Sequence, residues 1–288
     1  MNAADGAFGA LHRRGAPLVL PNAWDVTSAL LLARAGHPAI GTTSLGVTAA
    51  AGLPDGAGAG RELTTALAER LVPRLAVPLT VDLEGGYSDE PAEVGRLVAT
   101  LAGGGVAGVN LEDGQPGGWL RSPAHHAEVV AAAVEAAPGL FVNARTDTYW
   151  LAPSAPGGPP ASGRAGAPPS TGGSPAGAGD RLDETIGRLD AYRRAGAHGV
   201  FVPFVTDLGL VAAIADAVPL PLNVLWQPGT DIRALAAAGA ARVSTGSALY
   251  RQALAAVVAA VPRLDPSPSE RTPAPAPVSY AEVQDLLA

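Results

Sequence analysis

The sequence predicts one α/β domain of the (β/α)8 barrel class (TIM-type), followed by a short C-terminal helical extension. Three observations support this class. Short apolar runs alternate with alanine-rich helical segments along the whole 288-residue chain. Strands separated by helices must pair in parallel, because parallel neighbours need a crossover connection. Eight apolar runs can be counted, whereas an open doubly wound sheet usually has about five or six strands.

The expected strands follow one another at regular intervals, and each is a short run rich in Val, Ile, Leu or Ala. In chain order they are Leu18–Pro21, Ala39–Thr42, Leu79–Asp82, Gly108–Leu111, Phe141–Ala144, Gly199–Val202, Leu222–Leu225 and Arg242–Ser244. Helical segments are expected between them at Val26–Arg34, Ala92–Leu101, Ala124–Ala136, Glu184–Arg194 and Ile232–Ala238. At several joints a helix ends on glycine, which readily takes the left-handed conformation, and a strand follows at once.

Two segments interrupt this alternation. Residues 153–179 are almost wholly Pro, Gly, Ala and Ser, too poor in large apolar groups to offset their ordering entropy. We expect them to form a flexible insertion within a barrel of residues 1–262, because strands and helices resume afterwards. Residues 263–288 are expected to form a Pro-rich linker and a terminal helix that opens with the capping-box pattern Ser279–Glu282.

Composition excludes several classes of function. The formal charge is −7 and lysine is absent, which argues against nucleic acid or an anionic membrane as a partner. Cysteine is also absent, so a thiolate nucleophile and a Cys-ligated zinc site are excluded. No signal peptide or apolar run of about 20 residues is recognisable. We therefore expect a cytoplasmic protein with a small-molecule substrate.

Acidic and amide side chains gather at the predicted strand ends, where barrel enzymes have their active sites. Residues two apart on a strand share a face, which pairs Asp82 with Glu84, Asn110 with Glu112, and Asn143 with Arg145. Several converging carboxylates resist ionisation without a cation, and oxygen ligands suit Mg²⁺ or Mn²⁺. Alternatively, some of these acids pair with surface arginines or cap helices.

Other strand ends supply weaker candidates. Thr43 and Ser44 could present N–H groups and hydroxyls to a carboxylate or phosphate, or could form a simple turn. Trp24 could line the pocket, although a Trp beside a capping Asp is more often a packing residue. Asp55 follows the second strand, and Asn223 in the seventh strand is a further candidate for binding substrate.

Together these motifs resemble the isocitrate lyase/phosphoenolpyruvate mutase superfamily. The resemblance covers nearly the whole chain outside 153–179, in the Cys-less bacterial branch with a short gating loop. It is carried by Pro21–Asp25, Ser44–Asp55, Val81–Tyr87, Leu111–Asp113, Asn143–Asp147 and the Ser279–Glu282 helix.

The resemblance implies a barrel that uses Mg²⁺ (or Mn²⁺) to cleave or form a C–C or P–C bond in a small 2-oxo or 2-hydroxy carboxylate. By position, Asp82 would be the main metal ligand, with Glu84 and Glu112 binding directly or through water. Asp55 would face the metal. Arg145 would hold the substrate carboxylate and the developing enolate charge, and Thr43 and Ser44 would grip the substrate. A homo-oligomer, a dimer or a tetramer with an exchanged C-terminal helix, is also implied.

Departures from the family pattern narrow the activity. The lyases of the family carry a Lys-Lys-Cys-Gly-His loop after the fourth strand, whereas residues 113–121 here contain neither cysteine nor lysine. The leading hypothesis is a Mg²⁺-dependent lyase or decarboxylase acting on an oxaloacetate-like acid through an enolate. The alternatives are a phosphoenolpyruvate mutase-type P–C enzyme, in which Arg121 would be the loop cation, and a non-catalytic barrel that binds a 2-oxo acid.

Overall fold

The computed structural model describes residues 6–56, 58, 60–151, 176–260 and 279–285. Its main sheet is parallel, with strand order β1-β11-β10-β9-β8-β5-β4-β3-β2. The strands are β1 Leu18–Leu20, β2 Asn22–Ala23, β3 Ile40–Thr42, β4 Leu79–Asp82, β5 Gly108–Glu112, β8 Phe141–Arg145, β9 Gly199–Val202, β10 Leu222–Leu225 and β11 Ala240–Ser244. The predicted (β/α)8 barrel is thereby confirmed.

The first strand closes the ring in two pieces. Pro21 separates β1, which pairs with β11, from β2, which pairs with β3. The Asn22 side chain bridges the break: its Oδ1 accepts from the backbone N of Thr245 and of Gly246, both at 2.9 Å, while its Nδ2 donates to the carbonyl of Thr42 at 2.6 Å. The Asn22 amide therefore joins the residues that follow β11 to the end of β3.

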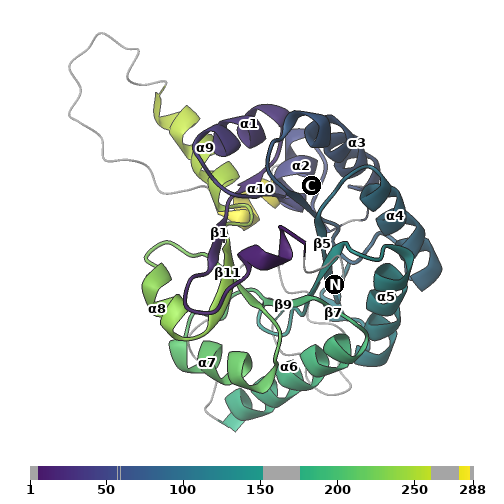
Figure 1. Cartoon of the computed structure of the whole chain (residues 1–288). Coiled ribbons are helices and arrows are strands. Elements are labelled where there is room, and N and C mark those ends of the chain that lie inside the picture. Colours follow the sequence, from purple (N-terminus) through teal and green to yellow (C-terminus); the bar gives the residue numbers. More distant parts are fainter. Residues whose placement is uncertain (1–5, 57, 59, 152–175, 261–278, 286–288) are drawn as a thin grey trace.

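The helices form an outer ring around the strands, except for the short C-terminal helix, which lies inside this ring in Figure 1. They are α1 Val26–Arg34, α2 Ser44–Ala50, α3 Arg61–Leu71, α4 Pro91–Gly103, α5 Pro123–Ala136, α6 Ala176–Arg194, α7 Leu208–Ala217, α8 Ile232–Ala237, α9 Ala248–Ala260 and α10 Tyr280–Asp285. Short 3-10 helices occur at Gly9–Leu11 (η2) and Val72–Arg74 (η3). No helix in these described ranges is long and apolar enough to cross a membrane.

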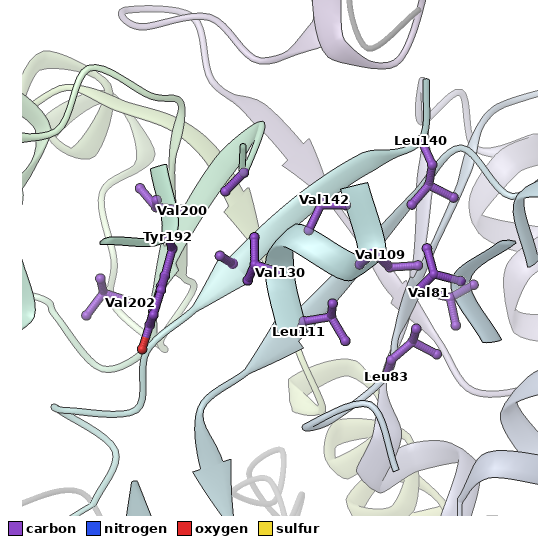
Figure 2. Packing of buried hydrophobic residues seen from close by; sticks show 14 of the residues in the cluster. Val81, Leu83, Val109, Leu111, Val130, Leu140, Val142, Tyr192, Val200 and Val202 are labelled. Atoms are coloured by element: carbon purple, nitrogen blue, oxygen red, sulfur yellow. The ribbon is translucent and has the colours of Figure 1, made fainter. Parts of the chain in front are cut away.

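Alternation along the strands separates an apolar outer face from a polar barrel interior. Val81, Val109 and Val142 are fully buried and lie on neighbouring strands in the apolar cluster (Figure 2). The intervening residues point inward, where the amide of Asn143 donates to Asn110 Oδ1 at 2.9 Å. Arg242 is also fully buried and donates to that same oxygen at 3.3 Å. Burial lowers the pKa of Arg242 to about 9, opposed by Asp82.

The N-terminal segment covers the base of the barrel, at the opposite end from the predicted site. η2 crosses the centre of the ring (Figure 1). Just before it, Phe8 packs edge-on against Phe141 at 5.6 Å. His12 stacks on the same ring at 4.3 Å, and burial lowers the pKa of His12 to about 4. The base is thus filled by rings rather than open.

Some boundaries differ from the sequence prediction. α6 begins at Ala176, so the end of the predicted insertion 153–179 is helical; residues 152–175 lie outside the described residues, as does the Pro-rich stretch 265–277. The helices α2, α3, α7 and α9 were not among the expected segments, and neither was a small hairpin, β6 Gly114–Gln115 with β7 Trp119–Leu120. The terminal helix is confirmed with its capping box. Ser279 N donates to the Glu282 carboxylate at 2.7 Å, and Glu282 N donates to Ser279 Oγ at 3.1 Å.

Candidate active site

A cavity of about 670 Å³ opens at the carboxyl ends of the barrel strands. Seven of the nine predicted site residues line it: Thr43, Ser44, Asp55, Asp82, Glu84, Glu112 and Arg145. The other two, Trp24 and Asn223, are not among the described residues that line the cavity. Trp24 packs against Tyr250, with ring centroids 5.3 Å apart. Asn223 is buried in the barrel and donates to Ser244 Oγ at 3.1 Å. The placement of Trp24 matches the packing alternative.

Arg145 is held from two sides at the end of β8. Its Nη1 lies 2.6 Å from Glu112 Oε2 on the paired strand β5. Its Nε and Nη2 donate to the two Asp147 oxygens at 2.5 and 3.0 Å. The Trp150 ring lies 5.2 Å from the guanidinium carbon. These contacts fix the guanidinium within the cavity.

Burial and pairing act in opposite directions on these groups. Burial raises the pKa of Asp147 to about 6 and the pKa of Glu112 well above its usual value, and Arg145 opposes both rises. Burial lowers the pKa of Arg145, but the charges of Asp147 and Glu112 outweigh burial and raise this pKa above its usual value, so Arg145 stays charged. Asp147 had no assigned role in the sequence prediction, although its place two residues after Arg145 was a usable signal.

Asp82 lies at the end of β4, facing the start of α2. Its Oδ2 accepts from the backbone N of Ser44 at 3.3 Å, and its own N donates to Thr42 Oγ1 at 3.0 Å. Thr43 is the N-cap residue of α2, so the first N–H group of this helix, that of Ser44, donates to the carboxylate, as expected from the positive end of a helix dipole.

Glu84 and Asp55 are two further buried acids of the cavity with raised pKa values. Glu84 has a left-handed backbone (φ 51°), and its Oε1 has no hydrogen-bond partner among the described residues. Burial, followed by the charges of Asp55 and Asp82, raises the pKa of Glu84 to about 8. Burial likewise raises the pKa of Asp55, opposed by a hydrogen bond of 2.7 Å from the Tyr280 hydroxyl. A Cβ at Gly60 would lie 2.9 Å from Glu84 Oε1, so glycine there leaves room for the carboxylate.

The donor set suits a hard divalent cation without enclosing one. Within the described ranges, no three Asp, Glu or His side chains are arranged so that they could hold a metal ion together. Mg²⁺ needs less, because it usually keeps several waters and binds one or two carboxylates plus the substrate. Asp82 and the unpartnered oxygen of Glu84 meet that need, whereas Glu112 is already paired with Arg145. That Asp82, Glu84 and Glu112 are metal ligands stays a prediction.

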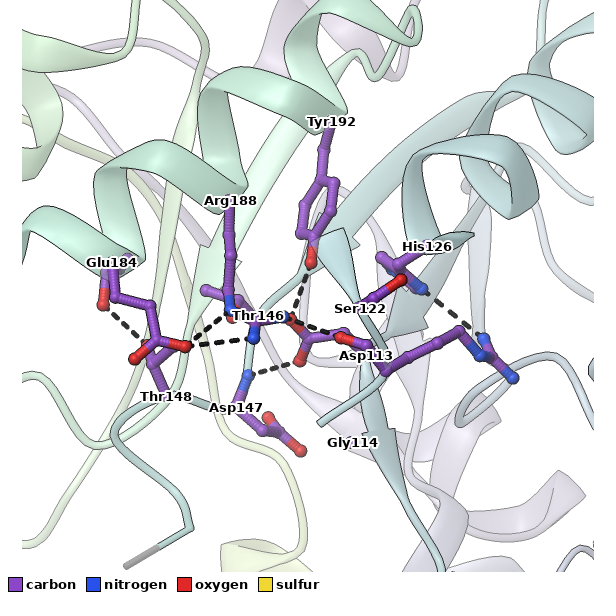
Figure 3. Close-up of polar contacts among 12 residues, drawn as sticks. Asp113, Gly114, Ser122, His126, Thr146, Asp147, Thr148, Glu184, Arg188 and Tyr192 are labelled. Atoms are coloured by element: carbon purple, nitrogen blue, oxygen red, sulfur yellow. Dashed lines mark hydrogen bonds and ion pairs between the residues drawn. The ribbon is translucent and has the colours of Figure 1, made fainter. Parts of the chain in front are cut away.

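A buried cluster around Asp113 lies next to Asp147, which lines the cavity (Figure 3). Its carboxylate is fully buried and accepts from the Thr146 hydroxyl, the Asp147 backbone N, Arg188 Nη1 and the Tyr192 hydroxyl at 2.7, 2.9, 3.2 and 2.7 Å. The cluster ties the residue after β5 to the residues after β8 and to α6. It therefore positions Asp147, and through it Arg145.

Arg121 does not serve as a free loop cation. Its Nη2 lies 2.8 Å from Asp89, and it donates to the carbonyls of Gly85 and Ser88 at 3.1 and 3.2 Å. The side chain is buried and joins the end of the hairpin to the loop after β4. The role that the mutase hypothesis gave to Arg121 is not supported by these contacts.

Comparison with known proteins agrees with the fold and shows the family. The family model for phosphoenolpyruvate phosphomutase matches residues 8–264. The chain is 41% identical over 281 residues to the uncharacterized protein Rv1998c of Mycobacterium tuberculosis (strain ATCC 25618 / H37Rv), which covers 98% of this chain and 96% of that protein. It is 29% identical over 228 residues to 2-methylisocitrate lyase of Escherichia coli K12, which covers 75% of this chain and 67% of the lyase.

A solved structure gives the same result. A candidate phosphonomutase from Burkholderia cenocepacia J2315 superposes with a TM-score of 0.77 at 37% identity, over 88% of this chain and 97% of that one. The fold, the strand-end acids and these matches together show that the chain belongs to the phosphoenolpyruvate phosphomutase family of the isocitrate lyase/phosphoenolpyruvate mutase superfamily.

Proposed function

We propose that this protein is a metal-dependent carbon–carbon lyase or decarboxylase acting on an oxaloacetate-like 2-oxo or 2-hydroxy acid through an enolate. The observation that carries the proposal is the fixed Arg145 guanidinium in a cavity lined by Asp55, Asp82 and Glu84. Such a site offers a positive charge where an enolate oxygen would develop, surrounded by acids that can hold protons or a cation.

Arg145 has N–H groups to spare for a substrate. A guanidinium has about five N–H donors, and the contacts to Glu112 and Asp147 use one on each nitrogen. The remaining donors on Nη1 and Nη2 can bind a carboxylate or enolate oxygen. Because the guanidinium is held in place before the substrate arrives, it stabilises the developing charge without reorganising.

Asp82 would hold the metal directly, with Glu84 and Glu112 acting through water. When bound, Mg²⁺ would draw electron density from the carbonyl and carboxylate of the 2-oxo acid. In cleavage of a 2-hydroxy acid, Glu112 would take the hydroxyl proton, since burial holds its pKa above the usual value. Decarboxylation needs no such base, which suits a loop without cysteine.

A ¹H and ³¹P NMR time course tests the proposal. The protein is incubated with Mg²⁺, or with EDTA as control, and with oxaloacetate, substituted malates and citrates, and phosphonopyruvate. Metal-dependent formation of pyruvate or another 2-oxo acid would support the lyase. If Arg145→Gln turned over the same substrate at an unchanged rate, the assigned mechanism would be wrong.

A phosphoenolpyruvate mutase-type activity is the second candidate. The 37% identity to a candidate phosphonomutase favours it, while the contacts of Arg121 count against it. A moving ³¹P resonance in the same experiment would establish the mutase. Binding without product, seen as thermal stabilisation, would indicate a 2-oxo-acid-binding protein. A cytoplasmic homo-oligomer remains a prediction, and light scattering would test its size.

A further inference from the structure

We propose that the outer part of the cavity binds an apolar, ring-sized substituent of the substrate, against a wall formed by Trp150, Tyr280 and Phe201. That such a substrate has an acid group bound at Arg145 rests on the proposed function. The wall itself follows from the residues that line the cavity. The substrate class is therefore a 2-oxo acid, such as a substituted oxaloacetate, that carries an apolar, ring-sized substituent.

Aromatic residues are concentrated at this cavity. The chain has four Trp, five Tyr and four Phe, and five of these thirteen line it: Tyr87, Trp119, Trp150, Phe201 and Tyr280. Aromatic side chains supply large apolar contact areas. A site for a small dianion alone would not need so many of them.

Three of the rings lie beside the acid-binding end and line the cavity. Trp150 and Phe201 lie 5.2 and 5.4 Å from the guanidinium carbon of Arg145. The Tyr280 ring stands edge-on to Trp150, with centroids 5.4 Å apart. A substituent attached to an acid held at Arg145 would reach this surface directly.

Tyr280 reaches the wall from the far end of the chain. Its hydroxyl donates to Asp55 at 2.7 Å, on the side of the cavity supplied by the loop after α2. Val283 on the same helix is buried in a cluster with Leu45 and Tyr250, which anchors α10. The ring is thus fixed at both its polar tip and its helix, as a wall of defined shape requires.

Charge makes a second remote anionic group a poor fit. The cations among the described residues that line the cavity are Arg121 and Arg145. Arg121 is bonded to Asp89 and to two carbonyls, and Arg145 serves the acid end. A remote carboxylate would be buried without a counterion, which is costly, whereas an apolar group would not be.

The size of the cavity agrees with this inference. Its volume of about 670 Å³ lies within the range of about 300–1,000 Å³ that holds drug-sized ligands. A four-carbon acid would fill only part of it. The remaining space is large enough for a ring-sized substituent.

Isothermal titration with two matched acids tests the inference without requiring turnover. The wild-type protein with Mg²⁺ is titrated with 2-oxobutanoate and with 2-oxo-4-phenylbutanoate. Burial of the phenyl ring should make the second bind ~50-fold more tightly. The ratio should fall to about 5-fold or less in Tyr280→Ala and in Trp150→Ala, because each removes a face of the wall. It should be retained in Tyr280→Phe, which keeps the ring, and in Tyr250→Phe, a tyrosine outside the cavity.

A wild-type ratio below about 3-fold, or no binding of the phenyl acid at millimolar concentration, would overturn the inference. An unchanged ratio in both alanine variants would overturn the assignment of the wall. The proposed function fails separately: if the phenyl acid binds preferentially but neither a phenyl-substituted malate nor any other acid in the NMR panel is cleaved, the lyase is wrong and the apolar site stands. If an acid of the panel is cleaved but the two titrated acids bind equally, the lyase stands and the apolar site is wrong.

Discussion

Replacing Asp113 with asparagine removes a negative charge from the centre of the buried cluster that joins the residues after β5 and β8 to α6. The carboxylate is fully buried, and every group that contacts it is a donor. An asparagine amide would keep the shape but would turn an N–H group toward one of these donors. Arg188, whose side chain is 9% exposed, would also lose its buried counterion.

The size of the effect follows from these contacts. Breaking a buried ion pair by removing one partner costs about 3–5 kcal/mol. Arg188 keeps a second partner, Glu184, at 3.0 Å, so the lower end of the range applies. We expect Asp113→Asn to lower the free energy of unfolding by about 3 kcal/mol, which for a domain of this size corresponds to roughly 6–12 °C in melting temperature.

Urea unfolding and calorimetry measure this loss directly. Asp190→Asn is the matched control, because Asp190 also pairs with arginines but is 35% exposed, and exposed pairs contribute about 0–1 kcal/mol. If Asp113→Asn lost less than about 1 kcal/mol, or no more than the control, the buried cluster would not stabilise the fold through its charge.

Three further predictions address packing, pH and metal. Gly46→Ala should cost about 1–3 kcal/mol in unfolding free energy, since its Cβ would lie 2.7 Å from Trp24 Cβ and 2.8 Å from Thr43 Cγ2; an unchanged melting temperature would contradict this packing. Burial lowers the pKa of His126 to about 4 from 6.5. As the pH falls, His126 is therefore protonated in the unfolded state before it is protonated in the folded state. Between pH 6.5 and 4 the free energy of unfolding of the wild type should therefore fall by up to about 3 kcal/mol more than that of His126→Asn. If the free energies of unfolding of the two proteins changed in parallel with pH, the lowered pKa of His126 would be refuted. Mg²⁺ at about 100 times its Kd should stabilise the wild type by about 2.7 kcal/mol but should not stabilise Asp82→Asn. If Mg²⁺ raised the melting temperatures of both proteins equally, Asp82 would not be a metal ligand.

Much of the fold was predictable because its signals are local. Alternating apolar runs and glycines at helix ends identify the strands and helices one at a time, without knowledge of their neighbours. The break at Pro21 was not predicted, because it depends on pairing with both β3 and β11. The hairpin of β6 and β7 was missed because Gly114–Leu120 has no alternating pattern.

The site was predictable where its residues lie on strands. Asp82, Glu112 and Arg145 are the last residues of β4, β5 and β8, and the carboxyl ends of parallel strands lie at the same end of the barrel. The bonds of Arg121 to the loop after β4, and the contact of Tyr280 with Asp55, join segments far apart in the chain. No local pattern encodes such contacts, so the structure was needed to find them.

The split first strand has a consequence for the order in which the chain folds. β1 pairs with β11, and Asn22 is held by Thr245 and Gly246, more than two hundred residues later. During synthesis from the N-terminus, β1 and the last strand cannot join until residue 246 has been made. Until then the nascent sheet has two unpaired edges, which are the kind of surface that associates with other chains. Closure of the barrel is therefore a late step, and an amide of one asparagine is among the groups that complete it.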